Sequence, residues 1–141
     1  MKSTKLLFIA FLLSLTFSFI NCTKDNNITS TTQEALIHSN WGVDFYFNNQ
    51  NLTGNYGSYR ILFSNTGLLV AQKNNETTTG NWSNSVDANN NEQVSLNFNT
   101  ADTNLVQLNR QWKVVNRTPA TIEFEGPDNI SPAEALRIRK Q

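Results

Sequence analysis

Large apolar side chains recur at every second position in short runs from residue 41 to the end of the chain. In the clearest run, Trp41, Val43, Phe45 and Phe47 occupy alternate positions. A period of two places these side chains on one face of a β-strand. The pattern therefore predicts strands that each have one apolar face, and such strands must fold together around a shared core.

Later runs follow the same pattern and are separated by turns rich in Asn, Gly or Pro. Their expected inward residues are Tyr59, Ile61 and Phe63; Leu68 and Val70; Trp82; Val94, Leu96 and Phe98; Trp112 and Val114; Ile122 and Phe124; and Leu136 and Ile138. Short strands at regular spacing are typical of a barrel or a sandwich. Strands that follow one another through short turns pair as neighbours, and closing the sheet removes its edges. We therefore predict an all-β, eight-stranded antiparallel up-and-down barrel.

A few segments depart from the strand pattern. Thr31 and Glu34 have the spacing of a capping box, which predicts a short helix before the first strand. Residues 104–108 predict one helical turn with Leu105 and Leu108 facing inward. Turn-rich loops are expected at residues 48–56 and 84–92. In the last segment, residues 131–134 resemble a helix start, so we expect a helical turn leading into the final strand.

The first 21 residues have the features of a secretory signal peptide. Lys2 and Lys5 precede an apolar run over residues 6–20, and the chain becomes polar directly after Cys22. The run is shorter than the roughly 20 residues that a membrane-spanning helix needs. We therefore divide the chain into a signal peptide at 1–21, a tether at 22–30 and a barrel domain at 31–141.

Cys22 is the only cysteine of the chain. Residues 19–22, Phe-Ile-Asn-Cys, resemble the lipobox of bacterial lipoproteins in the form seen in Bacteroidetes. The resemblance implies cleavage before Cys22, lipid attachment to this residue, and a place at the outer membrane, with the leaflet undetermined. The alternative is an ordinary cleaved signal peptide followed by a free thiol.

Composition narrows the classes of partner. Removing Lys2 and Lys5 with the signal peptide leaves nine basic and eleven acidic residues, so the mature chain is slightly acidic. There is no basic stripe, which argues against nucleic acid as a partner. A single cysteine permits no internal disulfide, so the core has to be stabilised by burial alone. We expect a monomer.

Four stretches in order resemble the small lipocalin-like lipoproteins of Bacteroidetes: Trp-Gly-Val-Asp-Phe-Tyr-Phe at 41–47, the hairpin sequence at 59–67, Thr-Gly-Asn-Trp-Ser at 79–83, and Leu-Asn-Arg-Gln-Trp-Lys-Val at 108–114. The likeness covers roughly residues 32–140. It implies a lipocalin-like barrel on a lipid anchor. It also implies that Arg137 or Arg139 stacks on Trp41.

Candidates for catalysis are weak. His38 is the only histidine, and without a second histidine or cysteine it supports neither a zinc site nor a nucleophile. Glu123 and Glu125 share a strand face, where a solvated outer surface explains them better than acid–base chemistry. Three loop aspartates lack the spacing of a calcium loop and are assigned to turns: Asp87, Asp102 and Asp128. We expect no enzyme, no cofactor and no metal.

The aromatic residues of the inner face lead to two hypotheses for function. In the first, the barrel binds a small hydrophobic molecule, with contacts from Trp41, Phe45, Tyr59, Phe63, Trp82, Phe98 and Trp112. In the second, these residues, together with Phe47 and Phe124, fill the interior. A barrel of eight strands has room for either arrangement. The filled protein would then dock partners through its loops, first of all loop 48–56 with Leu52 and Tyr56.

Overall fold

The computed structural model describes residues 31–127 and 133–141. Its elements are α1 Thr32–Ile37, β1 Asn40–Asn48, β2 Gln50–Asn51, the 3-10 helix η1 Thr53–Tyr56, β3 Tyr59–Phe63, β4 Leu68–Lys73, β5 Glu76–Val86, β6 Glu92–Phe98, α2 Thr103–Gln107, β7 Arg110–Arg117, β8 Thr121–Glu125 and β9 Ala135–Lys140. The predicted signal peptide, the tether with Cys22, and Asp128 lie outside the described residues. So does the start of the helical turn expected at 131–134, while Ala133 and Glu134 are not helical.

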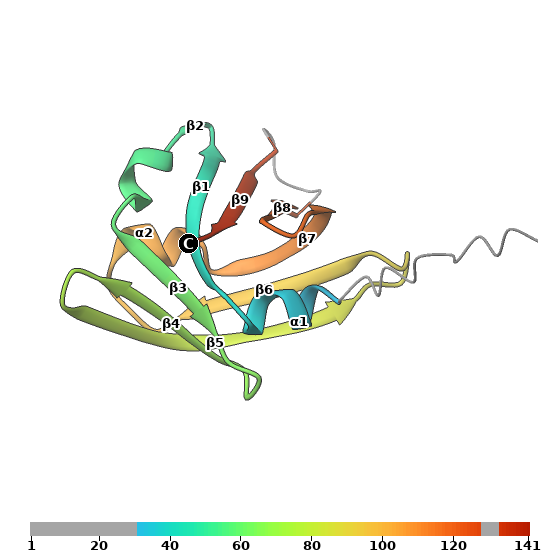
Figure 1. Cartoon of the computed structure of the whole chain (residues 1–141). Helices are drawn as coiled ribbons and strands as arrows, with labels where there is room; N and C mark the ends of the chain where they lie inside the picture. The colour runs from blue at the N-terminus through green and yellow to red at the C-terminus, as the bar shows by residue number, and fades with distance from the viewer. Residues whose placement is uncertain (1–30, 128–132) are drawn as a thin grey trace, which may run out of the picture.

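The strands form a closed eight-stranded antiparallel barrel, which confirms the predicted fold class (Figure 1). From β3 to β9 each strand pairs with the next one along the chain, and β1 closes the ring by pairing with both β3 and β9. The two-residue β2 only extends the pairing at the end of β1. One end of the barrel, where β1 begins and β3 ends, lies beside α1; the opposite end carries α2. We call them the α1 end and the α2 end.

Asparagine shapes several turns of the barrel. Asn49, Asn74 and Asn90 have φ values of 60°, 55° and 65°, in the left-handed region that Asn tolerates better than most residues. The loop predicted at 84–92 is shorter than expected, since β5 extends to Val86. In the β3–β4 hairpin the residue with positive φ is Gly67, as the sequence predicted.

A β-bulge in β1 corrects the predicted register of the first strand. The pairing with β9 shifts between Val43 and Phe45, so one extra residue lies on β1. Beyond the bulge the alternation is inverted. Tyr46 is fully buried in the interior, whereas Phe45 and Phe47 are only half-buried on the outer side. The expected inward orientation of Phe45 and Phe47 is therefore wrong.

The predicted inner face of β4 is also wrong. The β3–β4 ladder pairs Phe63 with Leu69. Residues paired across a ladder share a face, so Leu69 and Ala71 point inward with Phe63. Leu68 consequently points outward and is 43% exposed. The stretch from 68 to 71 is apolar on both faces, and periodicity alone cannot choose between its two registers.

Gly80 permits a close approach of two strands. It pairs with Phe98 across the β5–β6 ladder. A Cβ atom at this position would lie 2.2 Å from the carbonyl oxygen of Asn97 and 2.7 Å from the Cα of Phe98. Both are backbone atoms, so neither can move without separating β5 from β6. Any side chain here is therefore expected to disrupt the barrel wall.

The helix α1 covers the α1 end of the barrel. Thr31 caps it and Glu34 completes the predicted capping box. Leu36 is fully buried in the core. The buried Thr32 hydroxyl donates to the carboxylate of Glu92 at the start of β6. The short helix therefore spans the barrel mouth from β1 to β6 (Figure 1).

Candidate functional site

The barrel interior contains six of the seven aromatic residues predicted to contact a ligand. They are Trp41, Tyr59, Phe63, Trp82, Phe98 and Trp112, all buried. The seventh, Phe45, lies outside because of the β1 bulge. The sequence did not identify Tyr46 and Tyr56 as interior residues, although both are fully buried. A bulge has no clear sequence signal, and a tyrosine in a turn-rich loop can face either way.

The interior tryptophans all use their indole N–H groups on the chain's own backbone. The acceptors are the carbonyl oxygens of Leu36 for Trp41 at 3.0 Å, Ser64 for Trp82 at 2.9 Å and Leu108 for Trp112 at 3.0 Å. Each acceptor belongs to a connecting segment at an end of the barrel. The indoles therefore fasten these segments to the wall, and none has a free donor to offer a ligand.

The interior tyrosines are used in the same way at the α2 end. Their hydroxyls donate to the carbonyl of Gln107 from Tyr46 at 3.2 Å, to the carbonyl of Asn104 from Tyr56 at 2.8 Å, and to the carboxylate of Asp102 from Tyr59. All three acceptors lie in or next to α2. We call these three tyrosines and their acceptors the tyrosine clamp.

The rings of the clamp also pack on one another. Tyr46 meets Tyr56 edge-on at 5.3 Å between centroids and Trp112 at 6.3 Å. Edge-on aromatic pairs of this kind add roughly 0.5–1.5 kcal/mol to the burial of the rings. Leu105 of α2 and the following Leu108 are buried with them, as predicted for this helical turn. Apolar packing and hydrogen bonds therefore both hold α2 at its end of the barrel. Figure 1 shows the position of this helix.

Charges accompany the clamp where it reaches the surface. Lys73 donates to the Tyr59 hydroxyl at 3.2 Å and lies 4.8 Å from the centroid of the Tyr59 ring. The hydrogen bond from Tyr59 lowers the pKa of the Asp102 carboxyl, and the Lys73 charge acts in the same direction. Burial raises the pKa of the Tyr56 phenol, which therefore stays neutral as a hydrogen-bond donor. The group is a structural network whose acceptors are two backbone carbonyls and one ionised carboxylate.

Arg110 and Glu134 form an ion pair at the same end of the barrel. Glu134 is only 3% exposed. The Arg110 guanidinium also donates to the carbonyl of Gln107 at 2.8 Å and lies 5.3 Å from the centroid of the Trp112 ring. A buried carboxylate needs such a partner because desolvation of an unpaired charge is costly. The ion pair links the start of β7 to the residue before β9. Through its bond to the Gln107 carbonyl, Arg110 adds a fourth side-chain contact to α2.

These contacts limit what the interior can do chemically. Its indole and phenol donors are directed at backbone carbonyls and at the Asp102 carboxylate, and its apolar groups form one continuous cluster. A ligand that entered the α2 end would have to displace hydrogen bonds of the clamp. The six interior residues proposed as ligand contacts are therefore explained as core residues by the structure, without recourse to a ligand.

Loop 48–56 does not present the surface that the second hypothesis expected. Tyr56 lies in the interior, and Leu52 is half-buried against the core. The loop itself is ordered by the 3-10 helix η1 and by the bond from the Tyr46 amide to the Thr53 hydroxyl at 2.9 Å. Tyr56 therefore belongs to the core, and Leu52 packs against it.

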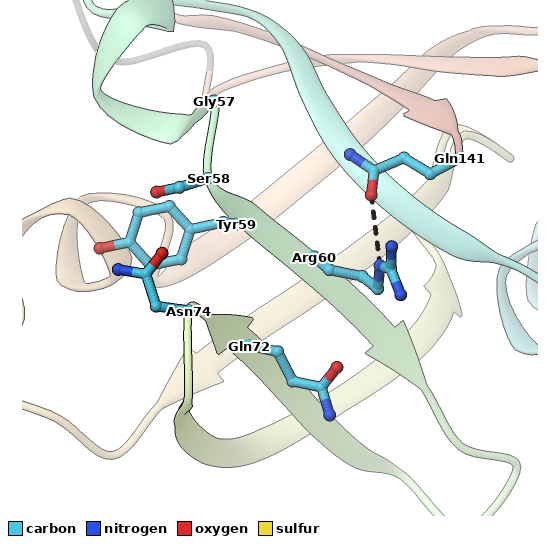
Figure 2. Close-up of a pocket in the computed structure, with 7 residues that line it drawn as sticks. All are labelled: Gly57, Ser58, Tyr59, Arg60, Gln72, Asn74 and Gln141. Atoms are coloured by element: carbon cyan, nitrogen blue, oxygen red, sulfur yellow. Dashed lines mark hydrogen bonds between the residues drawn. The ribbon is translucent and has the colours of Figure 1, made fainter.

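A polar depression of about 360 Å³ lies on the outer wall (Figure 2). It is lined by Gly57, Ser58, Tyr59, Arg60, Gln72, Asn74 and Gln141. Figure 2 shows Gln141 reaching toward Arg60, with a hydrogen bond of 3.4 Å between the Arg60 Nε and the amide oxygen of Gln141. The site opens where β1 leaves β3, since these strands pair only at two positions.

A second depression, of about 400 Å³, lies at the α1 end between the helix and β3. It is lined by Ile37, His38, Ser39, Asn40, Leu62 and Phe63. His38 is the C-cap residue of α1 and is exposed. This depression is more apolar than the first in residue type, and none of its residues carries a permanent charge.

The expected arginine stack on Trp41 is wrong. The cation beside this ring belongs to Lys140, whose Nζ lies 5.6 Å from the centroid. Arg137 and Arg139 point outward and donate to the Asp44 carboxylate at 2.7 and 2.9 Å. Their hydrogen bonds, that of Arg139 first, lower the pKa of Asp44. Both arginines thus reinforce the outer side of the β1–β9 closure.

The remaining candidate residues have structural roles. Glu123 lies on the outer wall with its carboxylate 3.8 Å from Arg137, as expected for a solvated face. Asp87 accepts the amides of Asn89 and Asn91 in a turn, and Asp102 caps α2. Within residues 31–127 and 133–141, no group of three or more metal-ligating side chains occurs. In the same ranges no helix is long and apolar enough to cross a membrane.

Comparisons with known proteins give a likeness of fold. No protein-family model and no curated protein matches the chain. A solved structure that resembles it is the crystal structure of a DUF4847 family protein from Bacteroides vulgatus, with a TM-score of 0.54 and 14% sequence identity. The match covers 77% of this chain and 98% of that one. At this identity the likeness concerns the fold alone.

Proposed function

We propose that the chain is a lipid-anchored protein of the bacterial cell envelope, of the lipocalin-like kind found in Bacteroidetes, and that it acts through its outer surface. In this proposal Cys22 carries the lipid and residues 22–30 connect it to the barrel. The barrel is a non-catalytic docking module.

The observation that supports this function is the use of the interior donors. Each indole of the barrel and each phenol of the tyrosine clamp donates to the protein itself. Sites for small molecules usually keep a few polar groups aimed at the ligand. Here such groups fasten α1, α2 and a hairpin, so the interior is best explained as a scaffold.

The anchor is tested by a Cys22→Ser substitution in the natural host. We expect the wild-type protein in the membrane fraction and in the detergent phase, and the variant in the soluble fraction. A conservative Ser83→Thr substitution on an exposed strand position provides the control for expression and export. Unchanged fractionation of the Cys22→Ser variant would contradict the anchor.

The filled interior is tested by native mass spectrometry of the released Cys22→Ser protein. We expect the mass of the protein alone and no uptake of fatty acids or hydrophobic dyes. Extra mass that leaves on denaturation would overturn the scaffold proposal and support ligand carriage instead. The released ligand could then be identified by extraction.

A further inference from the structure

Aliphatic side chains gather on the outer wall at the α1 end of the barrel. Leu62 and Val70 are direct partners in the β3–β4 ladder. Both are half-buried and point outward, because their neighbours Ile61 and Leu69 point inward. Leu68, at the start of β4, lies beside them and is 43% exposed. The fold does not require apolar residues here, since an outer wall can be polar.

The depression between α1 and β3 continues this surface. Leu62 lines it together with Ile37 at the end of α1. We define the end patch as the four residues Ile37, Leu62, Leu68 and Val70. The other side chains around the depression are hydroxyl, amide or imidazole groups, except for the buried Phe63 ring. Covering the depression would therefore desolvate no fixed charge.

The end patch lies at the end of the barrel that the tether reaches. Thr31 caps α1, and the six residues of this helix lead directly to Ile37 (Figure 1). Only residues 23–30 separate Cys22 from Thr31. A fully extended segment of this length spans at most about 30 Å. A lipid on Cys22 would thus keep the α1 end within that distance of the bilayer.

We propose that the end patch rests on the lipid surface to which Cys22 is anchored, with the α2 end directed away from it. This inference rests on the proposed anchor. An anchored protein meets the membrane at a high effective concentration, so a small apolar contact suffices to orient it. Uncharged polar groups around the patch suit the interfacial region, where a helix or loop buries its apolar face to a shallow depth.

The test uses the full lipidated chain in phospholipid vesicles that contain a nitroxide-labelled lipid. In the lipidated protein the Cys22 thiol is blocked, so an added cysteine is the only one that reacts with an environment-sensitive dye. One variant carries Leu68→Cys and the other Val106→Cys. These positions are matched, since Leu68 is 43% and Val106 44% exposed, but Val106 belongs to α2 at the opposite end.

We expect the dye at position 68 to lose fluorescence in the nitroxide vesicles and the dye at position 106 to keep it. A second pair of variants distinguishes orientation by the end patch from orientation by the tether alone. A dye at Asn65→Cys, in the hairpin turn, should lose its quenching in a Leu68→Asp background and keep it in a Val106→Asp background.

Each outcome has a separate meaning. Vesicle flotation measures the anchor, and its failure would overturn both the anchor and this inference. Flotation with equal quenching at positions 68 and 106 would overturn the inference alone. If quenching at position 65 is unchanged in the Leu68→Asp background, the tether and not the end patch sets the orientation. This result would also contradict the inference.

Discussion

The tyrosine clamp predicts what happens when α2 loses its hydrogen bonds while the core keeps its shape. The double substitution Tyr46→Phe and Tyr56→Phe removes two hydroxyls and leaves both buried rings in place. The carbonyl of Asn104 then loses the Tyr56 hydroxyl, and the carbonyl of Gln107 loses the Tyr46 hydroxyl but keeps its bond from Arg110. A neutral hydrogen bond of this kind contributes about 0.5–1.5 kcal/mol net, so the pair should cost about 1–3 kcal/mol.

The expected readout is local. At about 1.4 kcal/mol per tenfold change, α2 should open roughly 5- to 150-fold more often. Hydrogen exchange measures this opening through the amide of Val106, which is bonded to the Asp102 carbonyl at 2.9 Å in the native state. Amides of the β3–β4 ladder serve as the internal reference. A Trp82→Phe variant, which removes the indole bond to the carbonyl of Ser64 at the other end, is the control.

The reasoning would be refuted by either of two results. If exchange at α2 is unchanged, the hydroxyls do not hold this helix. If all amides accelerate equally in the double variant, the clamp contributes only to global unfolding and α2 is not a separate closure. A third result bears on function, because uptake of a hydrophobic dye by the double variant but not by the wild type would show that α2 keeps the interior closed.

Three further predictions follow from single positions. Gly80→Ala should destabilise the protein by about 1–3 kcal/mol or more in denaturant unfolding, because its Cβ would collide with backbone; Gly54→Ala, with nothing within 4 Å of the added Cβ, should not. Acidification should remove the stability that the Asp102 carboxylate contributes. The pKa of Asp102 is lowered in the folded state, so this contribution is present above the ordinary aspartate pKa and is lost as the pH falls below about 4. An Asp102→Asn variant should therefore show a shallower fall of Tm in this pH range. Tyr46→Ala should cost about 3–5 kcal/mol and Phe45→Ala distinctly less, and equal costs would contradict the bulged register.

Much of the barrel could be predicted because its information is local. Alternation in 59–63, 94–98 and 122–124 identifies strands whose inner residues are indeed buried. Turn residues such as Gly67 mark the hairpins. The capping box marks α1. These signals depend on a few neighbouring residues, so they are visible without knowledge of the partner strand.

The parts that could not be predicted depend on pairing between distant segments. The bulge in β1 is defined against β9, almost a hundred residues later, and it exchanges the faces of Phe45 and Tyr46. A one-residue shift inverts every side chain that follows it. The clamp is similar, since Tyr56 and its acceptor Asn104 are joined only by the closed barrel. Lys140 rather than an arginine meets Trp41 for the same reason.

The wrongly assigned face of β4 bears directly on function. The stretch 68–71 is apolar on both sides, and the core uses only Leu69 and Ala71. The core therefore does not need the side chains of Leu68 and Val70, whereas it uses every indole N–H and every hydroxyl of the tyrosine clamp. An apolar side chain that the core does not need is available to contact a membrane or another molecule. The search for function therefore belongs on the outer wall at the α1 end, where the chain leads back toward Cys22, and less in the interior where the aromatic residues first directed it.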